Sequence, residues 1–306
     1  MHNQQIKDFA KGKWQSILPE FGIDRKYLNH KHGPCPMCGG KDRWRFDDKN
    51  GLGTYFCSNC GSGDGFTLLS KKTHLSFADI AQKIRNLSNL SVSYKPIRQM
   101  SDEELQRRKK MLWERSESLS IGDPVCRYLA SRGIAPEALR VPSSVLRIAK
   151  DVLHPETKVR SYAMLAKVVS PNNQAVNIHI TYINEQGQKL DRRVMRGSLP
   201  EGCAVRLGQE NQVMGIAEGI ETALSASRLF NLPVWAALNA NQLSKWIPPK
   251  ICNEVWVFGD NDLSYTGQYK AYELANKLTR LGFAVSVFLP KDVGNDWNDE
   301  LNDEED

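Results

Sequence analysis

The spacing of apolar positions divides the chain into a helical start, a strand-rich middle and an end in which strands and helices alternate. Residues 2–30 place apolar side chains such as Ile6 and Trp14 near helical spacing, and we expect helix there, closed by Pro19 and the polar segment that follows it. Residues 30–68 are rich in glycine, cysteine and aromatic residues, and this composition indicates a first compact module.

Three further helices and one linker are predicted between residues 76 and 133. Ser101 and Glu104 form a Ser-x-x-Glu capping box, which opens a charged helix that runs to about Leu119. The other helices follow from short apolar stripes, and Gly133 should end the last of them. A run of turn-forming residues with little periodicity predicts the linker. The expected ranges are Ser76–Leu87 and Pro124–Arg132 for these helices and Asn86–Gln99 for the linker.

Between about Leu146 and Leu207 the pattern changes to extended runs. Tyr162–Val169 and Ala175–Ile183 have the length and composition of strands, and Asn184–Gly187 has the residues of a hairpin turn. We therefore expect a mixed α+β region in the middle of the chain.

From residue 212 onward short apolar runs alternate with helical patterns. This alternation is typical of βαβ units, and it predicts an α/β domain with a mainly parallel four-stranded sheet. The expected strands are Val213–Ala217, Val234–Leu238, Val255–Phe258 and Ala284–Leu289, and the expected helices are Glu221–Phe230, Asn241–Trp246 and about Gly267–Leu281.

Composition and charge narrow the class of protein. Apolar residues make up 41% and charged residues 25% of the chain, which is ordinary for a globular protein. No apolar run approaches the roughly 18–20 residues of a membrane span, and the polar N-terminus does not resemble a signal peptide. We therefore expect a cytoplasmic protein without a membrane partner.

The net charge of +6 is unevenly distributed. Residues 1–211 carry 34 Lys and Arg against 21 Asp and Glu, whereas residues 212–306 carry 7 against 14. A basic part suits a polyanionic partner and an acidic part suits a cation site. Scattered, solvated charge is the simpler account of the same numbers.

Four of the seven cysteines form two C-x₂-C pairs separated by 18 residues, Cys35 with Cys38 and Cys57 with Cys60. Each pair can direct both sulfurs at one ion, and four thiolates make the closed tetrahedral site of structural zinc. Such a site would stabilise a module too small to bury much apolar surface. A redox dithiol or chance pairing is the alternative. The other cysteines, which stand alone, are Cys126, Cys203 and Cys252.

The segment between the two pairs alternates basic and aromatic side chains. Aromatic rings can stack on unpaired bases, and Lys and Arg can hold phosphates. The expected nucleic-acid contacts are Lys41, Arg43, Trp44, Arg45 and Tyr55. We assign Phe46 and Phe56 to the small core of the module. His30 and His32 flank the metal site as surface groups, because four cysteines already fill its coordination shell.

This segment closely resembles the zinc ribbon of phage and plasmid DNA primases. The resemblance is carried by His-Gly-Pro-Cys-Pro-Met-Cys-Gly-Gly-Lys-Asp-Arg-Trp-Arg-Phe-Asp-Asp at residues 32–48 and Gly-Thr-Tyr-Phe-Cys-Ser-Asn-Cys-Gly-Ser-Gly-Asp-Gly at residues 53–65. In that family the ribbon is thought to recognise the single-stranded DNA template and to help start the primer. The resemblance therefore implies single-stranded DNA as a partner.

Acids follow two of the expected strands in the alternating part, Glu218 after one and Asp260 and Asp262 after the other. Ligands collect where neighbouring parallel strands end. Carboxylates gathered there repel one another unless a cation is present. The simplest occupant is a hard divalent ion such as Mg²⁺, which also binds substrate phosphates. The pattern predicts metal-assisted phosphoryl chemistry.

The Glu-Gly pair at Glu218 and the Asp-x-Asp motif at Asp260 and Asp262 resemble a Toprim domain, which bacterial-type primases share with topoisomerases and some nucleases. The resemblance implies that the two aspartates bind Mg²⁺ or Mn²⁺, and that Glu218 joins them or handles a proton. Glu221 either reaches the metal or is a helix-surface carboxylate near a positive N-terminus. Asp296 resembles part of a further acidic motif of these primases and is expected to bind the metal too.

Primer synthesis also requires cations that bind a triphosphate. Arg206, which lies between apolar neighbours, is our first choice, and Arg192 and Arg196 are the next. Residues 182–187 and 204–208 resemble the segment that precedes the Toprim domain in these primases and forms the other wall of the active cleft. An exposed, solvated cation is the alternative for each arginine.

The leading hypothesis is a DNA primase, a nucleotidyltransferase that makes short RNA primers on single-stranded DNA from ribonucleoside triphosphates. The sequence contains no P-loop, so we expect any replicative helicase to be a separate partner. Two alternatives stay open: a non-catalytic zinc-ribbon protein that binds single strands, and a Toprim-type nuclease.

The expected organisation is a multidomain α+β protein with six parts. They are a helical segment at 1–29, a zinc ribbon at 30–68, a helical and linker region at 69–120, a basic α+β region at 121–211, a Toprim α/β domain at 212–295, and an acidic motif and tail at 296–306.

Overall fold

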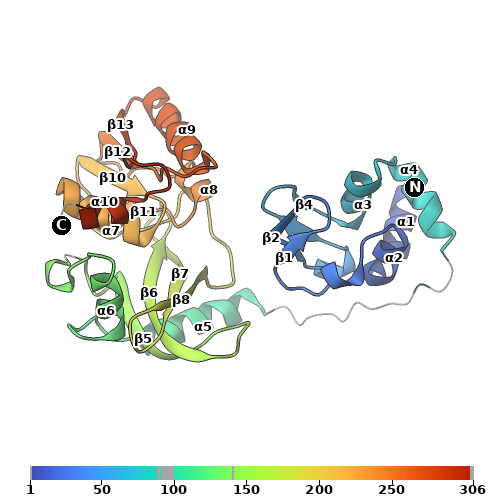
Figure 1. Ribbon diagram of the computed structural model, residues 1–306, viewed down its shortest axis with the longest axis horizontal. Coiled ribbons are helices and arrows are strands. Elements are labelled where there is room, and N and C mark those ends of the chain that lie inside the picture. The colour runs from blue at the N-terminus through green and yellow to red at the C-terminus, as the bar shows by residue number, and fades with distance from the viewer. Residues whose placement is uncertain (1, 88–89, 91–99, 140, 304–306) are drawn as a thin grey trace. The chain divides into compact units, whose positions relative to one another are not determined.

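The computed structural model describes residues 2–87, 90, 100–139 and 141–303, and the chain forms two compact units (Figure 1). Unit 1 comprises residues 1–99 and unit 2 comprises residues 100–306. Most of the linker expected over Asn86–Gln99 lies outside the described residues.

Unit 1 combines helices with a four-stranded antiparallel sheet in the order β1-β2-β3-β4. Its helices are α1 (His2–Ala10), α2 (Trp14–Glu20), α3 (Gly65–Thr73) and α4 (Phe77–Arg85), with short 3₁₀ turns at Arg25–Tyr27 and Lys49–Gly51. Its strands are β1 (Gly33–Cys35), β2 (Gly39–Phe46), β3 (Tyr55–Cys57) and β4 (Gly61–Gly63). The helix expected over residues 2–30 is two helices, because Gly12 adopts a left-handed φ of 78° between them. Pro19 lies within α2 rather than at its end.

One apolar core joins the helices of unit 1 to its sheet. The ring of Trp14 on α2 lies 5.0 Å from that of Phe66 on α3, and Trp44 and Tyr55 stack at 5.1 Å in the sheet. A Cβ on Gly65 would lie 2.3 Å from the Trp14 ring, so this close approach requires glycine. The helices supply the apolar partner that a ribbon of this size lacks by itself.

Unit 2 is built on one nine-stranded sheet in the order β13-β12-β10-β11-β9-β6-β7-β8, with β5 paired to β6. The expected four strands of the C-terminal domain do pair in parallel. The prediction of a mainly parallel, four-stranded sheet is nevertheless wrong for the sheet as a whole, which is mixed. The two-residue strand β9 joins both parts, because Val205 pairs antiparallel with Ala236 on one side and with Val168 on the other.

The strands of unit 2 fall close to the expected extended runs. They are β5 (Leu146–Leu153), β6 (Arg160–Val169), β7 (Ala175–Ile183), β8 (Lys189–Val194), β9 (Ala204–Val205), β10 (Val213–Ala217), β11 (Val234–Ala236), β12 (Glu254–Phe258) and β13 (Ala284–Phe288).

Helices cover both faces of this sheet. They are α5 (Asp102–Glu114), α6 (Pro124–Ala130), α7 (Ile220–Phe230), α8 (Ala240–Leu243), α9 (Thr266–Arg280) and α10 (Trp297–Asp303), with a 3₁₀ turn at Pro136–Ala138. Apolar side chains of α6, α7 and α10 share one core, whereas those of α8 and α9 share another. None of the helices in the described ranges is long and apolar enough to cross a membrane.

The charged helix that the capping box opens is shorter than expected. Ser101 Oγ does accept the Glu104 amide at 3.2 Å, as the sequence predicts. The helix ends at Glu114, however, rather than near Leu119. The Arg147 side chain binds both the hydroxyl and the carbonyl of Ser116. The next residue pairs with β5 as an isolated bridge, so the backbone there is extended.

Candidate zinc centre and acidic site

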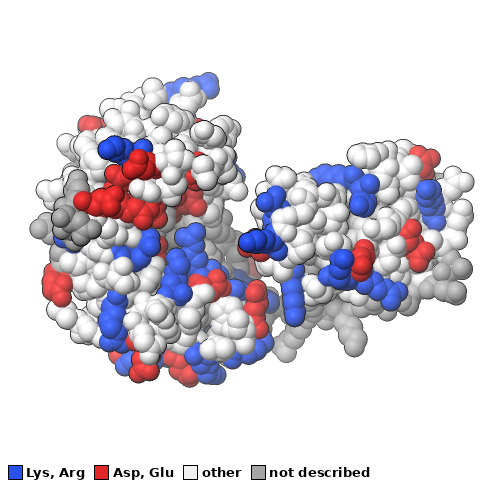
Figure 2. All heavy atoms as spheres, in the orientation of Figure 1, with Lys and Arg blue, Asp and Glu red and all other residues white. Residues whose placement is uncertain are grey.

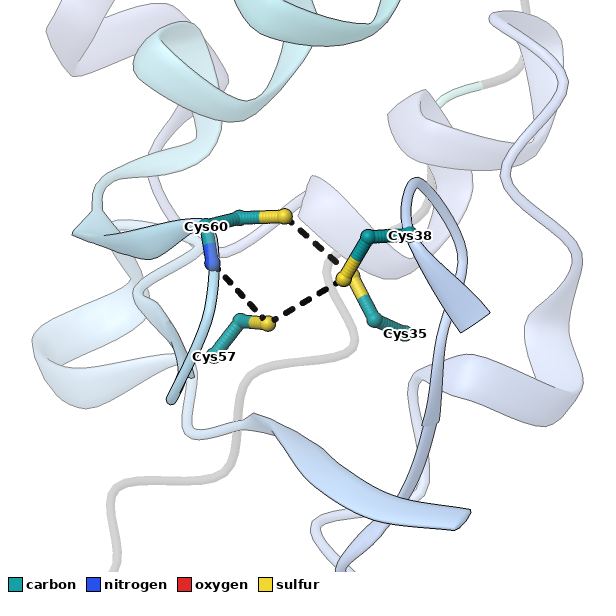
Figure 3. A group of neighbouring side chains, drawn as sticks. All are labelled: Cys35, Cys38, Cys57 and Cys60. Atoms are coloured by element: carbon teal, nitrogen blue, oxygen red, sulfur yellow. Dashed lines mark hydrogen bonds between the residues drawn. The ribbon is translucent and has the colours of Figure 1, made fainter. Parts of the chain in front are cut away.

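The sulfur atoms of Cys35, Cys38, Cys57 and Cys60 lie within 4.8 Å of one another (Figure 3). The Sγ atoms of Cys35 and Cys60 are 4.0 Å apart, and those of Cys38 and Cys57 are 3.7 Å apart. Both distances are close to the edge, roughly 3.8 Å, of a tetrahedron with zinc–sulfur bonds of about 2.3 Å. The amides of Met37 and Cys60 donate to Cys35 Sγ and Cys57 Sγ. This is the donor set of a structural zinc site.

Two of the expected nucleic-acid contacts, Trp44 and Tyr55, are core residues. Their exposed fractions are 1% and 2%, and Trp44 Nε1 donates to the Tyr27 carbonyl at 2.9 Å. The predicted stacking on bases is wrong for both, because a buried ring has no face to offer. Strand alternation explains the error: Cys57 points inward, and Tyr55, two positions earlier on β3, points the same way.

Phe56, unlike these two buried rings, lies on the surface of the ribbon. It is 43% exposed and lies opposite Arg45 in the register of β2 and β3. Arg45 Nη1 in turn lies 3.3 Å from His32 Nε2. An exposed ring beside a guanidinium is suited to stacking on a base. Our sequence reasoning assigned Phe56 to the core, although alternation from the adjacent metal-binding cysteine would have placed it outside.

The basic residues expected on this ribbon do lie on its surface. Lys41 is exposed, and Arg43 and Arg45 are partly exposed. Gly40 adopts a left-handed φ of 85°, which favours glycine in this turn, and the Arg43 side chain lies across it. Arg45 is also paired with Asp47, at 2.6 Å between Nε and Oδ1.

The acids expected at the strand ends do meet, at the carboxyl ends of the parallel strands β10 and β12. Burial, followed by the charges of Glu218, Asp296 and Asp262, raises the pKa of Asp260 to about 7. Asp260 Oδ1 is buried and has no hydrogen-bond partner. Burial also raises the pKa of Glu218, and the charge of Asp262 adds to this shift. Carboxylates that repel one another around a free oxygen are stabilised by a cation.

Asp262 also shapes the loop that opens α9. Its Oδ1 accepts the Ser264 amide at 2.8 Å, and its Oδ2 accepts the Gly267 amide at 2.7 Å. Burial alone would raise the pKa of Asp262, but hydrogen bonds from Ser264, Gly267 and Thr266 lower it below its usual value. A Cβ on Gly267 would lie 2.7 Å from the Asp260 carbonyl oxygen and 2.9 Å from Asp262 Oδ2. Glycine is therefore required where the helix meets the acids.

Asp296 approaches the same place from the start of α10. Trp297 Nε1 donates to the Gly259 carbonyl at 3.2 Å, and this bond fixes α10 beside the loop after β12. Asp296 Oδ1 accepts amides of the first turn of α10, and Oδ2 lies 3.5 Å from Arg132 Nη2. The charge of Asp296 contributes to the raised pKa of Asp260.

The donor chemistry of these acids fits a hard divalent cation. Asp260 offers an oxygen without a partner, and Glu218 has a raised pKa that a cation would reverse. The acids are less tightly gathered than the thiols, however. Within the described ranges, the four cysteines form the one group of His, Cys, Asp or Glu side chains whose ligand atoms all lie within 4.8 Å of one another.

Arg192 on β8 lies within electrostatic reach of the acidic site. Its positive charge opposes the rise that burial causes in the pKa of Glu218 and of Asp260. Lys189 on the same strand lowers the pKa of Glu221. Figure 2 shows acidic side chains gathered over the part of unit 2 that carries α10, with basic side chains on the adjoining surface.

Arg206, our first choice for nucleotide binding, is engaged elsewhere. Its Nη1 lies 2.8 Å from Glu210 Oε1, its Nη2 donates to the Ser170 carbonyl, and its guanidinium lies 4.7 Å from the Trp235 ring centroid. β9 runs antiparallel to β11, so the residues after β9 lie at the opposite end of the strands from the acids. The prediction for Arg206 is therefore wrong. Arg196 is exposed in the segment after β8.

Glu221 contradicts one of the two accounts that the sequence left open. It is 7% exposed, so it is not a helix-surface carboxylate, and its Oε1 accepts the Tyr128 hydroxyl at 2.5 Å. His179 on β7 is equally buried, and its Nδ1 has no hydrogen-bond partner. Burial lowers the pKa of His179 to about 4. No sequence pattern singled out Tyr128 or His179, because their partners lie far away along the chain.

Three domain families match the chain. The zinc-binding domain of primase-helicase matches residues 30–66, the Toprim domain matches residues 213–305, and a domain of unknown function matches residues 103–207. The first two coincide with the zinc centre and the acidic site. The third contains Arg192, whose charge acts on Glu218 and Asp260.

Solved primase structures are similar to this chain at low sequence identity. The Aquifex aeolicus primase, with its zinc-binding and RNA polymerase domains, is 16% identical, with 98% of this chain and 82% of that chain covered and a TM-score of 0.45. The primase fragment of the bacteriophage T7 primase-helicase protein is 17% identical, with 90% and 96% covered and a TM-score of 0.44. A DNA primase domain from Pseudomonas aeruginosa is 12% identical, with 65% and 74% covered and a TM-score of 0.42.

Proposed function

We propose that this chain, a primase-type protein that joins the zinc-binding domain of primase-helicases to a Toprim domain, synthesises short RNA primers on single-stranded DNA. The zinc ribbon contacts the template, and the acidic site joins ribonucleotides. The domain of unknown function supplies the basic side of that site. Unwinding of the duplex is assigned to a replicative helicase that acts with this chain.

The outer face of the ribbon supports the role in template binding. Phe56 offers an exposed ring, and Arg45 and Arg43 lie on the neighbouring strand. Base–aromatic stacking contributes about 1–3 kcal/mol per base and tolerates any sequence, while arginines bind phosphates. The ribbon can therefore hold an unpaired template strand.

The observation that carries the catalytic proposal is Asp260. Asp260 is half-buried, has a pKa of about 7 and a buried oxygen without a hydrogen-bond partner, and feels the charges of Glu218, Asp296, Asp262 and Arg192. Burying a carboxyl among other carboxyls lowers the stability of the fold, so this arrangement indicates a functional site rather than a structural one. It is suited to a site that receives cations together with an anionic substrate.

The site residues divide the work of nucleotide addition. The primer 3′-hydroxyl attacks the α-phosphorus of the incoming ribonucleotide, a new P–O bond forms, and the bond to the leaving pyrophosphate breaks. Asp260 and Asp262, with Asp296 beside them, would hold Mg²⁺ or Mn²⁺, which neutralises the charge that grows on the transferred phosphoryl group. Glu218, whose pKa is raised, is suited to accept the hydroxyl proton. Arg192 binds the triphosphate.

The test is incorporation of labelled ribonucleotides on circular single-stranded DNA with Mg²⁺. The wild type should make short RNA, and Asp260→Asn and Glu218→Gln should each lower the rate at least 100-fold, because the first removes a cation ligand and the second removes the group that accepts the hydroxyl proton. Asp292→Asn is the matched control, because Asp292 is an exposed carboxylate near the same loop, and it should retain activity.

Two results would contradict this function. Binding of single strands without any incorporation would indicate a non-catalytic replication protein, and degradation of the DNA in the absence of ribonucleotides would indicate a Toprim-type nuclease. Normal primer synthesis by Asp260→Asn would remove the acidic site from the mechanism.

A further inference from the structure

Three exposed tyrosines lie on α9 and directly before it. Tyr265, Tyr269 and Tyr272 are 73%, 61% and 56% exposed. Tyr269 and Tyr272, three residues apart, lie on the same face of the helix, and Tyr265 is the residue that precedes its first turn. We call these three residues the tyrosine stripe. Leu263, in the loop just before α9, is 81% exposed and extends this apolar surface towards Asp262.

The fold does not need the tyrosine stripe. The opposite face of α9 is anchored by Ala271, Leu274 and Leu278, each of which is fully buried against the sheet. Rings that stay exposed bury little apolar area, so they contribute little to the stability of the fold. A row of large aromatic side chains left in water therefore points to a ligand or partner.

The stripe begins where the acidic site ends. The Tyr265 amide donates to the Asp262 carbonyl at 3.1 Å, and Ser264 donates to Asp262 Oδ1 with both its amide and its hydroxyl. Tyr265 has a φ of 59°, a left-handed conformation that is unfavourable for a bulky residue. The hydrogen bonds of Asp262 thus maintain a strained loop, and this loop presents the Tyr265 ring to solvent.

α9 carries a net positive charge, which favours a polyanionic ligand, whereas the stretch 212–306 as a whole is acidic. The helix carries Lys270, Lys277 and Arg280 against Glu273, and these are three of only seven Lys and Arg residues in the acidic stretch 212–306. Lys270 Nζ lies 5.1 Å from the ring centroid of Tyr269. Rings flanked by cations are the usual means of binding unpaired bases together with their phosphates.

We propose that the tyrosine stripe is a stacking surface for the unpaired bases of single-stranded DNA that passes the acidic site. The inference rests on the proposed function only for the identity of this ligand. A strand held by Tyr265 lies next to Asp262, so stacking on α9 keeps it in register with the acids while the zinc ribbon binds elsewhere along it.

The test maps the contact without asking for catalysis. Oligothymidine substituted with 5-iodouracil is photo-crosslinked to the full chain in the absence of ribonucleotides and Mg²⁺, and the tryptic peptides are identified. We expect crosslinks in the peptide that ends at Lys270, which contains Tyr265 and Tyr269, and in the following peptide, which contains Tyr272. Crosslinks at Phe56 in the ribbon would appear in a separate peptide.

Variants measure the contribution of the stripe to affinity. The double substitution Tyr269→Ala with Tyr272→Ala should weaken oligothymidine binding at least fivefold, because each stacked base contributes about 1–3 kcal/mol. Tyr269→Phe with Tyr272→Phe should bind as the wild type does. Leu281→Ala is the control: Leu281 is 64% exposed at the end of α9 and lies outside the stripe, so its loss should change nothing.

Unchanged binding by the double alanine variant, or crosslinks confined to the ribbon, would overturn the proposal and leave the stripe as a contact for a protein. Crosslinks on α9 in a chain that makes no primers would support the stripe and refute the proposed polymerase. Primer synthesis by a chain that gives no crosslinks on α9 would support the proposed polymerase and refute the stacking surface.

Discussion

The Tyr128 hydroxyl donates a hydrogen bond of 2.5 Å to Glu221 Oε1 in the buried interior of unit 2. Tyr128 lies on α6, in the domain of unknown function, and Glu221 lies on the first turn of α7, in the Toprim domain. Burial alone would raise the pKa of Glu221, but the hydrogen bond from Tyr128 and the charges of Lys189 and His179 lower it. Glu221 therefore holds the basic region against the Toprim domain.

We predict that Tyr128→Phe destabilises the protein by about 1–3 kcal/mol, because it leaves a buried carboxylate without its donor. Thermal unfolding of this variant, of Glu221→Leu and of the combined variant would form a double-mutant cycle. The combined loss should be smaller than the sum of the single losses. Additive losses would mean that the bond contributes nothing to stability.

Variants of Arg192 and Arg206 test which arginine binds the nucleotide. We propose that Arg192 does, whereas the side chain of Arg206 is engaged in other contacts. Arg192→Ala should raise the KM for ribonucleotides about 10-fold or more, because the charge of Arg192 acts at the acidic site, where we propose that it binds the triphosphate. Arg206→Ala should leave KM within about twofold and lower the melting temperature, because its guanidinium contacts Glu210 and Trp235. Steady-state kinetics and thermal unfolding of both variants test this; the opposite assignment of effects would refute it.

Phe56 and Phe46 separate template binding from folding within the ribbon. Phe56→Ala should weaken binding of oligothymidine about fivefold or more with little change in stability, because the ring is exposed. Phe46→Ala should destabilise unit 1 by roughly 3–5 kcal/mol, because the ring is fully buried. Fluorescence anisotropy and thermal unfolding measure the two effects. Equal affinity for the Phe56 variant and the wild type would argue against stacking.

Zinc removal should unfold unit 1 and leave unit 2 intact. The four thiolates close on one ion and the two units have separate apolar cores, and structural zinc sites contribute on the order of 10–16 kcal/mol in small modules. Calorimetry with and without a chelator should show loss of one transition only. Cys57→Ser should have the same effect without chelator, whereas Cys252→Ser, at a buried cysteine of unit 2, should preserve the first transition.

His179 predicts a loss of stability on mild acidification. Its folded pKa is about 4, below its usual value of 6.5, because burial and the charges of Arg192 and Lys189 disfavour the imidazolium despite Glu221. Between these values the unfolded chain binds a proton that the folded chain does not, so stability falls as pH drops from about 6.5 to 4, by up to about 3 kcal/mol. Denaturant unfolding at pH 7 and pH 5 should show a smaller difference for His179→Gln. An identical difference would exclude His179 as its source.

The sequence by itself determined the local features. The two C-x₂-C pairs predicted the zinc centre, and the acids after two apolar runs predicted that Glu218, Asp260 and Asp262 would meet. Both predictions depend on short-range rules: a tight turn directs two sulfurs the same way, and parallel strands end at a common edge. The alternation from residue 212 onward placed the strands and the helices α7, α8 and α9 within a few residues of their observed positions, but it missed α10, which was expected to be an acidic tail.

Only the tertiary structure decided which side chains are available. Alternation along β3 already places Phe56 opposite Tyr55, but only the packing of the unit 1 helices makes the face with Trp44 and Tyr55 the buried one. The charge of Arg192, rather than that of Arg206, acts on the acids. Arg206 follows β9, which runs antiparallel to β11, so it lies at the opposite end of the strands from the acids. Glu221 meets Tyr128 across 93 residues of chain. Such facts depend on packing between distant segments, and the pattern of residues along one segment carries no information about its neighbour in space.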